Sequence, residues 1–204
     1  MKSVLLSIHP KWCEKILSGE KRIEVRKSAP KEVPFKCYIY CSYGNDRETY
    51  MLGRRGKVIG EFICDKIEDF YCASIPYQKE NNLGYGRFID NGVYKVNGWH
   101  EGIVFERNDR YIDTMLNNDD LKEMCLSAQE LFDYVGVGKH LYAWHISDLK
   151  IYDKPRELSE FVVPCKTSCE NCKKVFFYDC WETNGKVKAV TRPPQSWCYV
   201  EEEK

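Results

Sequence analysis

The sequence has no apolar run long enough to cross a membrane, and it has no net charge. No stretch of its 204 residues approaches the roughly 18 apolar residues of a transmembrane helix. The apolar run after Met1 is too short for a signal peptide. We therefore expect a soluble, cytoplasmic protein without a membrane partner. With 31 Lys or Arg against 31 Asp or Glu, the total charge neither favours nor excludes a nucleic-acid partner.

The charges are unevenly distributed along the chain. Residues 1–60 hold 13 Lys or Arg and 6 Asp or Glu, whereas the remainder holds 18 and 25. A basic N-terminal third before an acidic remainder fits an anionic ligand held by one face of the protein. An imbalance of this size in one segment also arises by chance.

The first third of the chain predicts a small, strongly curved sheet with one early helix. Apolar runs typical of buried strands occupy residues 3–8, 35–42 and 57–67. Pro10 fits the first turn of a helix over residues 11–18, and Gly19 follows that helix as its C-terminal glycine. Gly60 lies inside a predicted strand, where glycine indicates a bulge or a close backbone approach. The predicted fold class is α+β, mainly β, with short helices.

The middle of the chain has no clean hydrophobic period. We interpret residues 71–126, rich in Asn, Asp, Gly and Tyr, as an insertion on the surface of the domain, with a helical turn or two near its end. Ser127 and Glu130 form a capping-box pattern that predicts a short helix. Residues 140–149 alternate as one long core strand that continues to Tyr152, and a turn is predicted at 153–155.

The stretch Gly19–Lys27 places charged residues in a strand-like run. Because strand side chains alternate between faces, Glu24 and Arg26 share one face. Lys21 points the other way unless it still belongs to the preceding turn. The pattern fits an ordinary edge strand with a solvated face. It fits equally well a strand whose Lys21, Glu24 and Arg26 form the floor of a ligand cleft.

Four of the eleven cysteines lie close together near the C-terminus: Cys165, Cys169, Cys172 and Cys180. Four thiolates at such spacing can wrap a tetrahedral zinc ion, and clustered cysteines in a reducing compartment point to metal more than to disulfides. The surrounding sequence is short and polar, so a structural zinc would supply its folding energy. An iron–sulfur cluster, four unligated cysteines, and Cys198 as a replacement ligand stay open as alternatives.

A second stretch, Gln195-Ser196-Trp197, follows two prolines that stiffen the chain. It offers an amide, a hydroxyl and a large π surface, which are the groups that hold a nucleobase by edge hydrogen bonds and stacking. A single tryptophan is also often a core residue. The environment of Cys198, between Trp197 and Tyr199, is typical of a strand returning to the core.

The motif Gly19-x-Lys21-x-x-Glu24-x-Arg26, placed after a strand and a short helix, resembles the signature of ASCH domains, which belong to the PUA-like superfamily. The resemblance extends over the strands predicted up to about residue 67 and the strand at 140–149. It implies a small PUA-like β-barrel with a cleft lined by Lys21, Glu24 and Arg26, and a partner that is RNA or a nucleotide.

The predicted domain organisation follows from this resemblance and from the cysteine cluster. Residues 1–163 would form the ASCH domain, with 71–126 as its surface insertion. Residues 164–204 would form a zinc-stapled, Cys-rich segment whose last strand returns to the barrel. The leading hypothesis is therefore an RNA- or nucleotide-binding module, to which His9, Gln195, Ser196 and Trp197 add candidate ligand contacts.

Two other hypotheses are kept. Some ASCH proteins hydrolyse acetylated cytidine with a Lys, a Thr three residues later and a downstream Glu. Lys21 matches that pattern but Glu24 stands at the Thr position, so the resemblance implies binding more than this hydrolysis. A hydrolase acting on a modified nucleoside would use Lys21 and Glu24 as catalytic candidates, with His9 or His145 as polar neighbours.

A protein-interaction module would dock a partner through the Cys-rich tail or the insertion.

Overall fold

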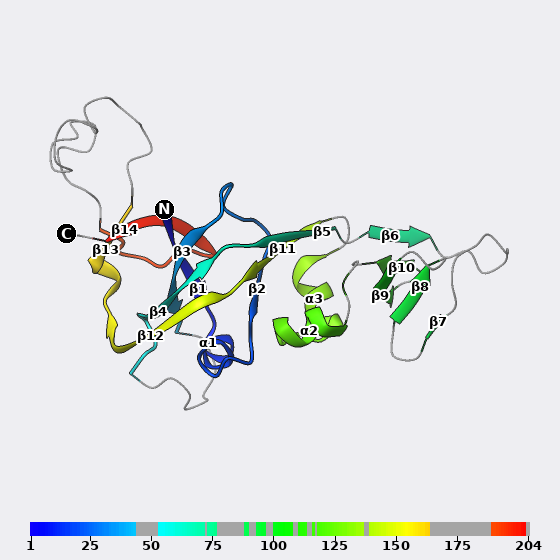
Figure 1. The fold of residues 1–204 in the computed structure, drawn as a ribbon, viewed down its shortest axis with the longest axis horizontal. Helices are drawn as coiled ribbons and strands as arrows, with labels where there is room; N and C mark the ends of the chain where they lie inside the picture. The colour runs from blue at the N-terminus through cyan, green and yellow to red at the C-terminus, as the bar shows by residue number, and fades with distance from the viewer. Residues whose placement is uncertain are drawn as a thin grey trace, which may run out of the picture. The chain divides into compact units, whose positions relative to one another are not determined.

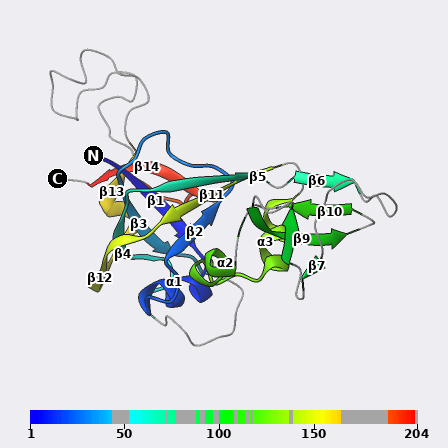
Figure 2. The same cartoon turned by 45° about the vertical axis from the view of Figure 1, so that its right-hand side comes forward.

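The computed structural model describes two compact units, and each is treated by itself. The described residues are 1–43, 53–71, 73–76, 88–89, 93–96, 100–107, 110–113, 116, 118–136, 139–163 and 189–202. The first unit comprises Met1–Leu17, Pro34–Asp65 and Ser147–Lys204, and the second comprises Ser18–Val33 and Lys66–Ile146. Strands predominate among the described elements and the helices are short, which confirms the mainly β prediction (Figures 1 and 2).

The first unit contains one helix, one 3-10 turn and six strands among its described residues. They are β1 (Lys2–Ile8), α1 (Pro10–Leu17), β3 (Phe35–Cys41), β4 (Lys57–Cys64), β12 (Ser147–Arg156), the 3-10 turn η1 (Leu158–Glu160), β13 (Phe161–Val162) and β14 (Trp197–Glu202). The strands predicted at 3–8, 35–42 and 57–67 and the helix predicted at 11–18 therefore exist, with boundaries that differ by one to three residues.

The six strands of the first unit form one sheet in the order β12-β4-β3-β1-β14-β13. β1 is central and pairs in parallel with β3 and antiparallel with β14, where Leu5 faces Cys198. Cys198 therefore lies in a strand that returns to the core sheet, as its neighbours predicted. Within the described residues the pairing does not continue from β13 back to β12, so these strands form an open sheet and no closed barrel.

Both faces of the central strand β1 are buried, because the successive residues Val4, Leu5 and Leu6 are all inaccessible. On one face Leu5, Tyr38, Val58 and Phe161 belong to a buried cluster, while Cys13 and Ile16 of α1 are also buried. Gly60 has no room for a side chain, because a Cβ there would lie 2.6 Å from the carbonyl oxygen of Lys150 in β12. This confirms the close backbone approach that a glycine inside a strand predicted.

The second unit contains two helices and eight strands among its described residues. They are β2 (Ile23–Arg26), β5 (Ile67–Tyr71), β6 (Ala73–Pro76), β7 (Phe88–Ile89), β8 (Val93–Val96), β9 (His100–Arg107), β10 (Arg110–Asp113), α2 (Asn118–Met124), α3 (Ala128–Val135) and β11 (His140–His145). β2, β11 and β5 form an antiparallel sheet in that order, and a five-stranded sheet has the order β6-β10-β9-β8-β7. Figure 2 shows β9 and β10 side by side.

One face of the β2-β11-β5 sheet is covered by the two helices of the second unit. Ile23 and Val25 of β2 share a buried cluster with Leu141 and Ala143 of β11 and with residues of the two helices, which are Met124 of α2 and Leu131 and Val135 of α3. The capping box that opens α3 is confirmed, because the Ser127 amide donates to Glu130 and the Glu130 amide donates to Ser127 Oγ at 3.2 Å. Gly136 follows α3 with a positive φ of 81°, as expected for a C-terminal glycine.

Two predictions about the later strands were wrong. The single strand predicted from 140 to 152 is divided at Ile146 into β11 and β12, which belong to different sheets. Asp148 has a positive φ of 47°, a backbone change that hydrophobic alternation does not report. Residues 153–155, predicted to form a turn, are instead part of β12. Pro155 is tolerated there because β12 is an edge strand.

The segment 71–126 carries more regular structure than its sequence indicated. It contains β6 to β10 and α2, and Leu116 and Met124 lie in the buried cluster of the second unit. Its description as a surface insertion, and the division of the chain at residues 163 and 164, stay predictions. No helix in the described part of the chain is long and apolar enough to span a membrane.

Candidate functional site

Lys21, Glu24 and Arg26, which belong to the second unit, lie together and are buried. Their exposed fractions are 3%, 5% and 9%. One carboxylate lies between two cations, with Glu24 Oε1 2.8 Å from Arg26 Nη2 and Glu24 Oε2 3.5 Å from Lys21 Nζ. β2 begins at Ile23, so Lys21 precedes the strand and its side chain can reach the face of Glu24. β2 is an edge strand of its sheet, as one interpretation expected, but the solvated face of that interpretation was wrong, since every residue of β2 is buried.

The Lys21 ammonium also contacts the end of α2. Lys21 Nζ donates a hydrogen bond of 2.5 Å to the carbonyl oxygen of Met124, and the Arg22 amide donates to the carbonyl oxygen of Glu123. The last carbonyls of a helix have no partner within the helix and carry partial negative charge, so a cation there is favourable. Burial nevertheless lowers the pKa of Lys21, with the charge of Glu24 acting in the opposite direction.

Arg26 and Lys27 both meet Tyr134, an aromatic residue of α3. Arg26 hydrogen-bonds the Tyr134 hydroxyl, and Lys27 Nζ lies 4.9 Å from the centroid of the Tyr134 ring. Burial raises the pKa of the Tyr134 phenol, although the charge and hydrogen bond of Arg26 act against this rise. Tyr134 is still 38% exposed, so this pair of cations borders an accessible ring.

The strand register places two more aromatic residues on the face that carries Glu24 and Arg26. Trp144 of β11 lies opposite Glu24, and Tyr142 lies opposite Arg26. Directly opposed residues of an antiparallel pair have their side chains on the same face. Trp144 is fully buried, whereas Tyr142 is half-buried. The charged residues of β2 therefore share a face with an aromatic row on β11.

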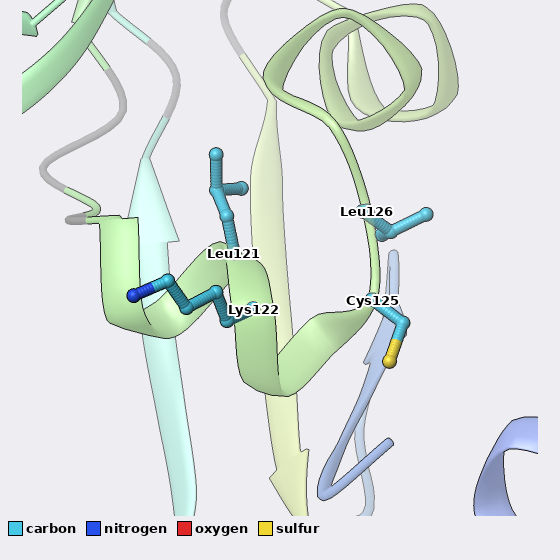
Figure 3. Close-up of a pocket in the computed structure, with 4 residues that line it drawn as sticks. All are labelled: Leu121, Lys122, Cys125 and Leu126. Carbon is cyan, nitrogen blue, oxygen red and sulfur yellow. The ribbon is translucent and has the colours of Figure 1, made fainter. Parts of the chain in front are cut away.

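An open pocket lies at the C-terminal end of α2 and is lined by Leu121, Lys122, Cys125 and Leu126 (Figure 3). Figure 3 shows the first two residues on α2 and the other two on the segment that joins α2 to α3. Met124, whose carbonyl accepts the Lys21 hydrogen bond, immediately precedes Cys125. Buried Lys21 is thus hydrogen-bonded to the end of α2, next to the residues that line this pocket.

The other predicted ligand contacts lie in the first unit. Half-buried His9 precedes α1, and its carbonyl accepts hydrogen bonds from the amides of Trp12 and Cys13. Gln195 is exposed, the Ser196 carbonyl accepts a hydrogen bond from the Ser7 amide, and Trp197 is half-buried in β14 opposite Leu6. The structure thus groups Lys21 with Glu24 and Arg26, while the role of these four residues in binding stays a prediction.

His145 takes part in a separate hydrogen-bonded network with Glu68, on the face of the second unit's sheet opposite to Glu24. Its Nε2 lies 2.7 Å from Glu68 Oε2, and Lys66 Nζ lies 2.8 Å from Glu68 Oε1. The hydrogen bond from Lys66 lowers the pKa of Glu68, with a smaller contribution from His145. Register places His145 opposite Ile23, on the helix-covered side, so it is not a neighbour of the Glu24 carboxylate.

The predicted zinc ligands Cys165, Cys169, Cys172 and Cys180 lie outside the described residues. The described part of the chain holds no group of three or more metal-ligating side chains. Zinc therefore stays a prediction of the sequence.

Sequence reasoning missed Tyr134, Tyr142 and the Met124 carbonyl as neighbours of the charged motif. The alternation of residues 140–145 shows that Tyr142 and Trp144 share a face, but it does not show which strand pairs with β11. The carbonyl of Met124 comes from a segment that has no clear hydrophobic period. Only tertiary structure brings these groups to Arg26 and Lys21.

Comparison with known proteins gives matches among solved structures alone. No protein-family model matches the sequence, and no curated protein matches it. The chain is similar to ASCH proteins of known structure. An ASCH protein from Zymomonas mobilis is 16% identical, and the match covers 98% of this chain and 88% of that chain with a TM-score of 0.45.

Two variants of the same Zymomonas mobilis protein, each carrying one substitution, also match. Both are 15% identical and both matches cover 98% of this chain, with 91% and 89% of the other chain and TM-scores of 0.45 and 0.48. ASCH is also the family that the motif from Gly19 to Arg26 resembles. The function proposed below rests on the contacts of this chain's own residues.

Proposed function

We propose that this protein binds RNA or a nucleotide, and that Lys21, Glu24 and Arg26 hold the phosphate or the edge of a base. The observation that carries the proposal is the buried group of two cations around one carboxylate. When all three residues are ionised, they carry a combined charge of +1. Burying charge is costly unless it is paired, so an anionic group bound beside Arg26 would offset that charge.

The geometry also suits recognition by hydrogen bonds. A guanidinium presents five donors in a planar fork that matches phosphate and base edges. The carboxylate of Glu24 lies 2.8 Å from Arg26 Nη2, which orients this fork before any ligand arrives. Exposed Lys27 follows directly and supplies a second cation for a phosphate.

The sequence offers a matched control for this proposal. Arg22 is exposed and lies four residues before Arg26 in the same unit. Arg22→Gln and Arg26→Gln therefore remove the same charge from a solvated and from a buried position. Short single-stranded RNAs and nucleoside phosphates labelled with a fluorophore provide the binding probes, and anisotropy gives the dissociation constants.

We expect Arg26→Gln to weaken binding roughly 10- to 150-fold, which is the effect of losing a hydrogen bond to a charged group. Arg22→Gln should change the constant by less than about threefold. Thermal unfolding of both variants checks that each is folded at the assay temperature. The proposal is rejected if the wild type binds none of these probes, or if Arg22→Gln weakens binding as much as Arg26→Gln does.

A second candidate function is hydrolysis of a modified nucleoside, and the lowered pKa of Lys21 favours it. Burial shifts this residue toward the neutral amine, which can accept a proton or activate a water molecule. Glu24 lies 3.5 Å away and would orient the amine. Incubation of the wild type with acylated nucleosides should then give products, and Lys21→Met should abolish them. Absence of turnover by the wild type removes this candidate.

A further inference from the structure

Three strands of the second unit bring one positive, one aromatic and one negative residue into a single row. Arg26 of β2 lies opposite Tyr142 of β11, and Tyr142 lies opposite Asp69 of β5. Cβ atoms of directly opposed residues are about 4.5–5.5 Å apart. Tyr142 is therefore flanked on the same face by a guanidinium and a carboxylate. We call these three residues the cross-strand row.

His140 adds a second ring beside this row. It lies two residues before Tyr142 in β11 and so points to the same face of the strand. The centroids of the two rings are 6.2 Å apart and their planes differ by 21°. His140 Nδ1 lies 2.7 Å from Asp69 Oδ1, and this contact holds the imidazole in place. The two rings form an ordered pair that is accessible, because His140 is exposed and Tyr142 is half-buried.

We propose that Tyr142 and His140 are the base-stacking subsite of this protein, and that they take an unpaired nucleotide whose phosphate is bound by Arg26 and Lys27. This inference rests on the proposed RNA or nucleotide binding, and it adds the kind of nucleic acid that is recognised. Arg26 is paired with Glu24 and also lies in the cross-strand row. One ligand can therefore contact both the Glu24–Arg26 pair and Tyr142.

The physical argument is that a stacking site needs a rigid, accessible π surface with polar groups at its edge. Tyrosine and histidine rings supply that surface with few rotatable bonds, and stacking tolerates every base because each has a π face. Arg26 offers donors on one side of Tyr142, while Asp69 offers an acceptor on the other. A base on the Tyr142 ring would thus find both kinds of hydrogen-bonding partner within the width of the sheet.

The same geometry selects single strands. Stacked and paired bases of a duplex are not available to side-chain rings, whereas bases in loops and ends can be splayed out. A sheet face whose aromatic and charged residues alternate across neighbouring strands therefore suits a single-stranded or terminal nucleotide.

The test compares Tyr142→Leu, Tyr142→Phe and His140→Leu in the full-length protein. The probes are a short fluorescent single-stranded RNA, the duplex of the same sequence, and ribose 5-phosphate, which has the phosphate but no base. Tyr142→Leu should weaken binding of the single strand roughly 5- to 150-fold, the size of one base–aromatic stack, while Tyr142→Phe keeps wild-type affinity within about twofold. Exposed His140 should tolerate leucine, and His140→Leu should also weaken binding.

Tyr43 provides the matched control because it is a tyrosine that is 70% exposed and belongs to the first unit. Tyr43→Leu should leave binding unchanged. Ribose 5-phosphate should bind the wild type and Tyr142→Leu equally, because it cannot stack.

Unchanged single-strand binding by both Tyr142→Leu and His140→Leu would overturn the stacking subsite while leaving the proposed function standing. Equal affinity of the wild type for the duplex and the single strand would overturn it too. If the wild type binds none of the three probes, the proposed function itself fails, and the stacking inference fails with it.

Discussion

Glu24 contacts both buried cations, Lys21 and Arg26, so it is the residue that compensates the buried positive charge. Removing one partner from a buried ion pair leaves an uncompensated charge and costs about 3–5 kcal/mol. We therefore predict that Glu24→Gln lowers the free energy of unfolding by about that amount in urea denaturation. Glu20→Gln, at an exposed position in the same segment, should change it by no more than about 0.5 kcal/mol. Similar stabilities for the two variants would contradict the buried pairing.

Lys21 should make stability depend on pH in a defined direction. Its pKa in the folded protein lies below the ordinary value of 10.5 because burial penalises the ammonium. Between these two pKa values the unfolded chain binds more protons at this residue than the folded chain, so the free energy of unfolding rises with pH there. The free energy of unfolding of the wild type minus that of the non-titrating variant Lys21→Met should therefore increase as pH approaches 10.5. A flat or falling difference would show that the Lys21 pKa is not lowered.

At the residue scale, the sequence identified Lys21, Glu24 and Arg26 as one unit but could not decide between solvent and burial. Period-two alternation assigns faces, and both faces of β2 are buried in the structure. The residues that complete the group, Met124 and Tyr134, come from helices more than a hundred residues later. Contacts over such separations leave no pattern in a single sequence.

At the element scale, α3 tests whether local sequence signals carry stability. The capping box predicted from Ser127 and Glu130 is present, with the Ser127 amide and hydroxyl each 2.9 Å from Glu130 Oε2. Loss of an N-terminal serine cap costs about 0.5–2 kcal/mol. We predict a destabilisation of this size for Ser127→Ala in urea denaturation, and less than about 0.5 kcal/mol for Ser159→Ala at an exposed position. Equal effects would mean that the cap adds nothing.

Elements defined by local signals were predicted well, and elements defined by sheet membership were not. α1 has its proline at the first position, and Gly19 beyond its end has a positive φ of 77°. β11 and β12 read as one strand because their alternation continues across Ile146, although they pair with strands of different sheets. Strand partners are chosen by long-range packing, which a window of ten residues does not contain.

At the scale of the whole molecule, the zinc prediction concerns cysteines outside the described residues. Elemental analysis of the purified protein should find about one zinc per chain, and Cys169→Ser and Cys172→Ser should each lose it. Cys198→Ser should retain the metal, because Cys198 lies in β14 opposite Leu5 of the central strand β1. Protein without near-stoichiometric zinc or iron would contradict a four-cysteine metal site, and zinc loss from Cys198→Ser would change its ligand set.

The most direct test of the central claim is an NMR titration of ¹⁵N-labelled protein with a nucleoside monophosphate. A ligand bound by Lys21, Glu24 and Arg26 must change the chemical environment of the backbone amides of this segment and of the paired strand β11. We predict that the largest amide shift changes occur at residues 21–27 and 140–142, and that Arg26→Gln abolishes them. Shift changes confined to other parts of the chain, or none at saturating nucleotide, would contradict a binding site at Lys21, Glu24 and Arg26.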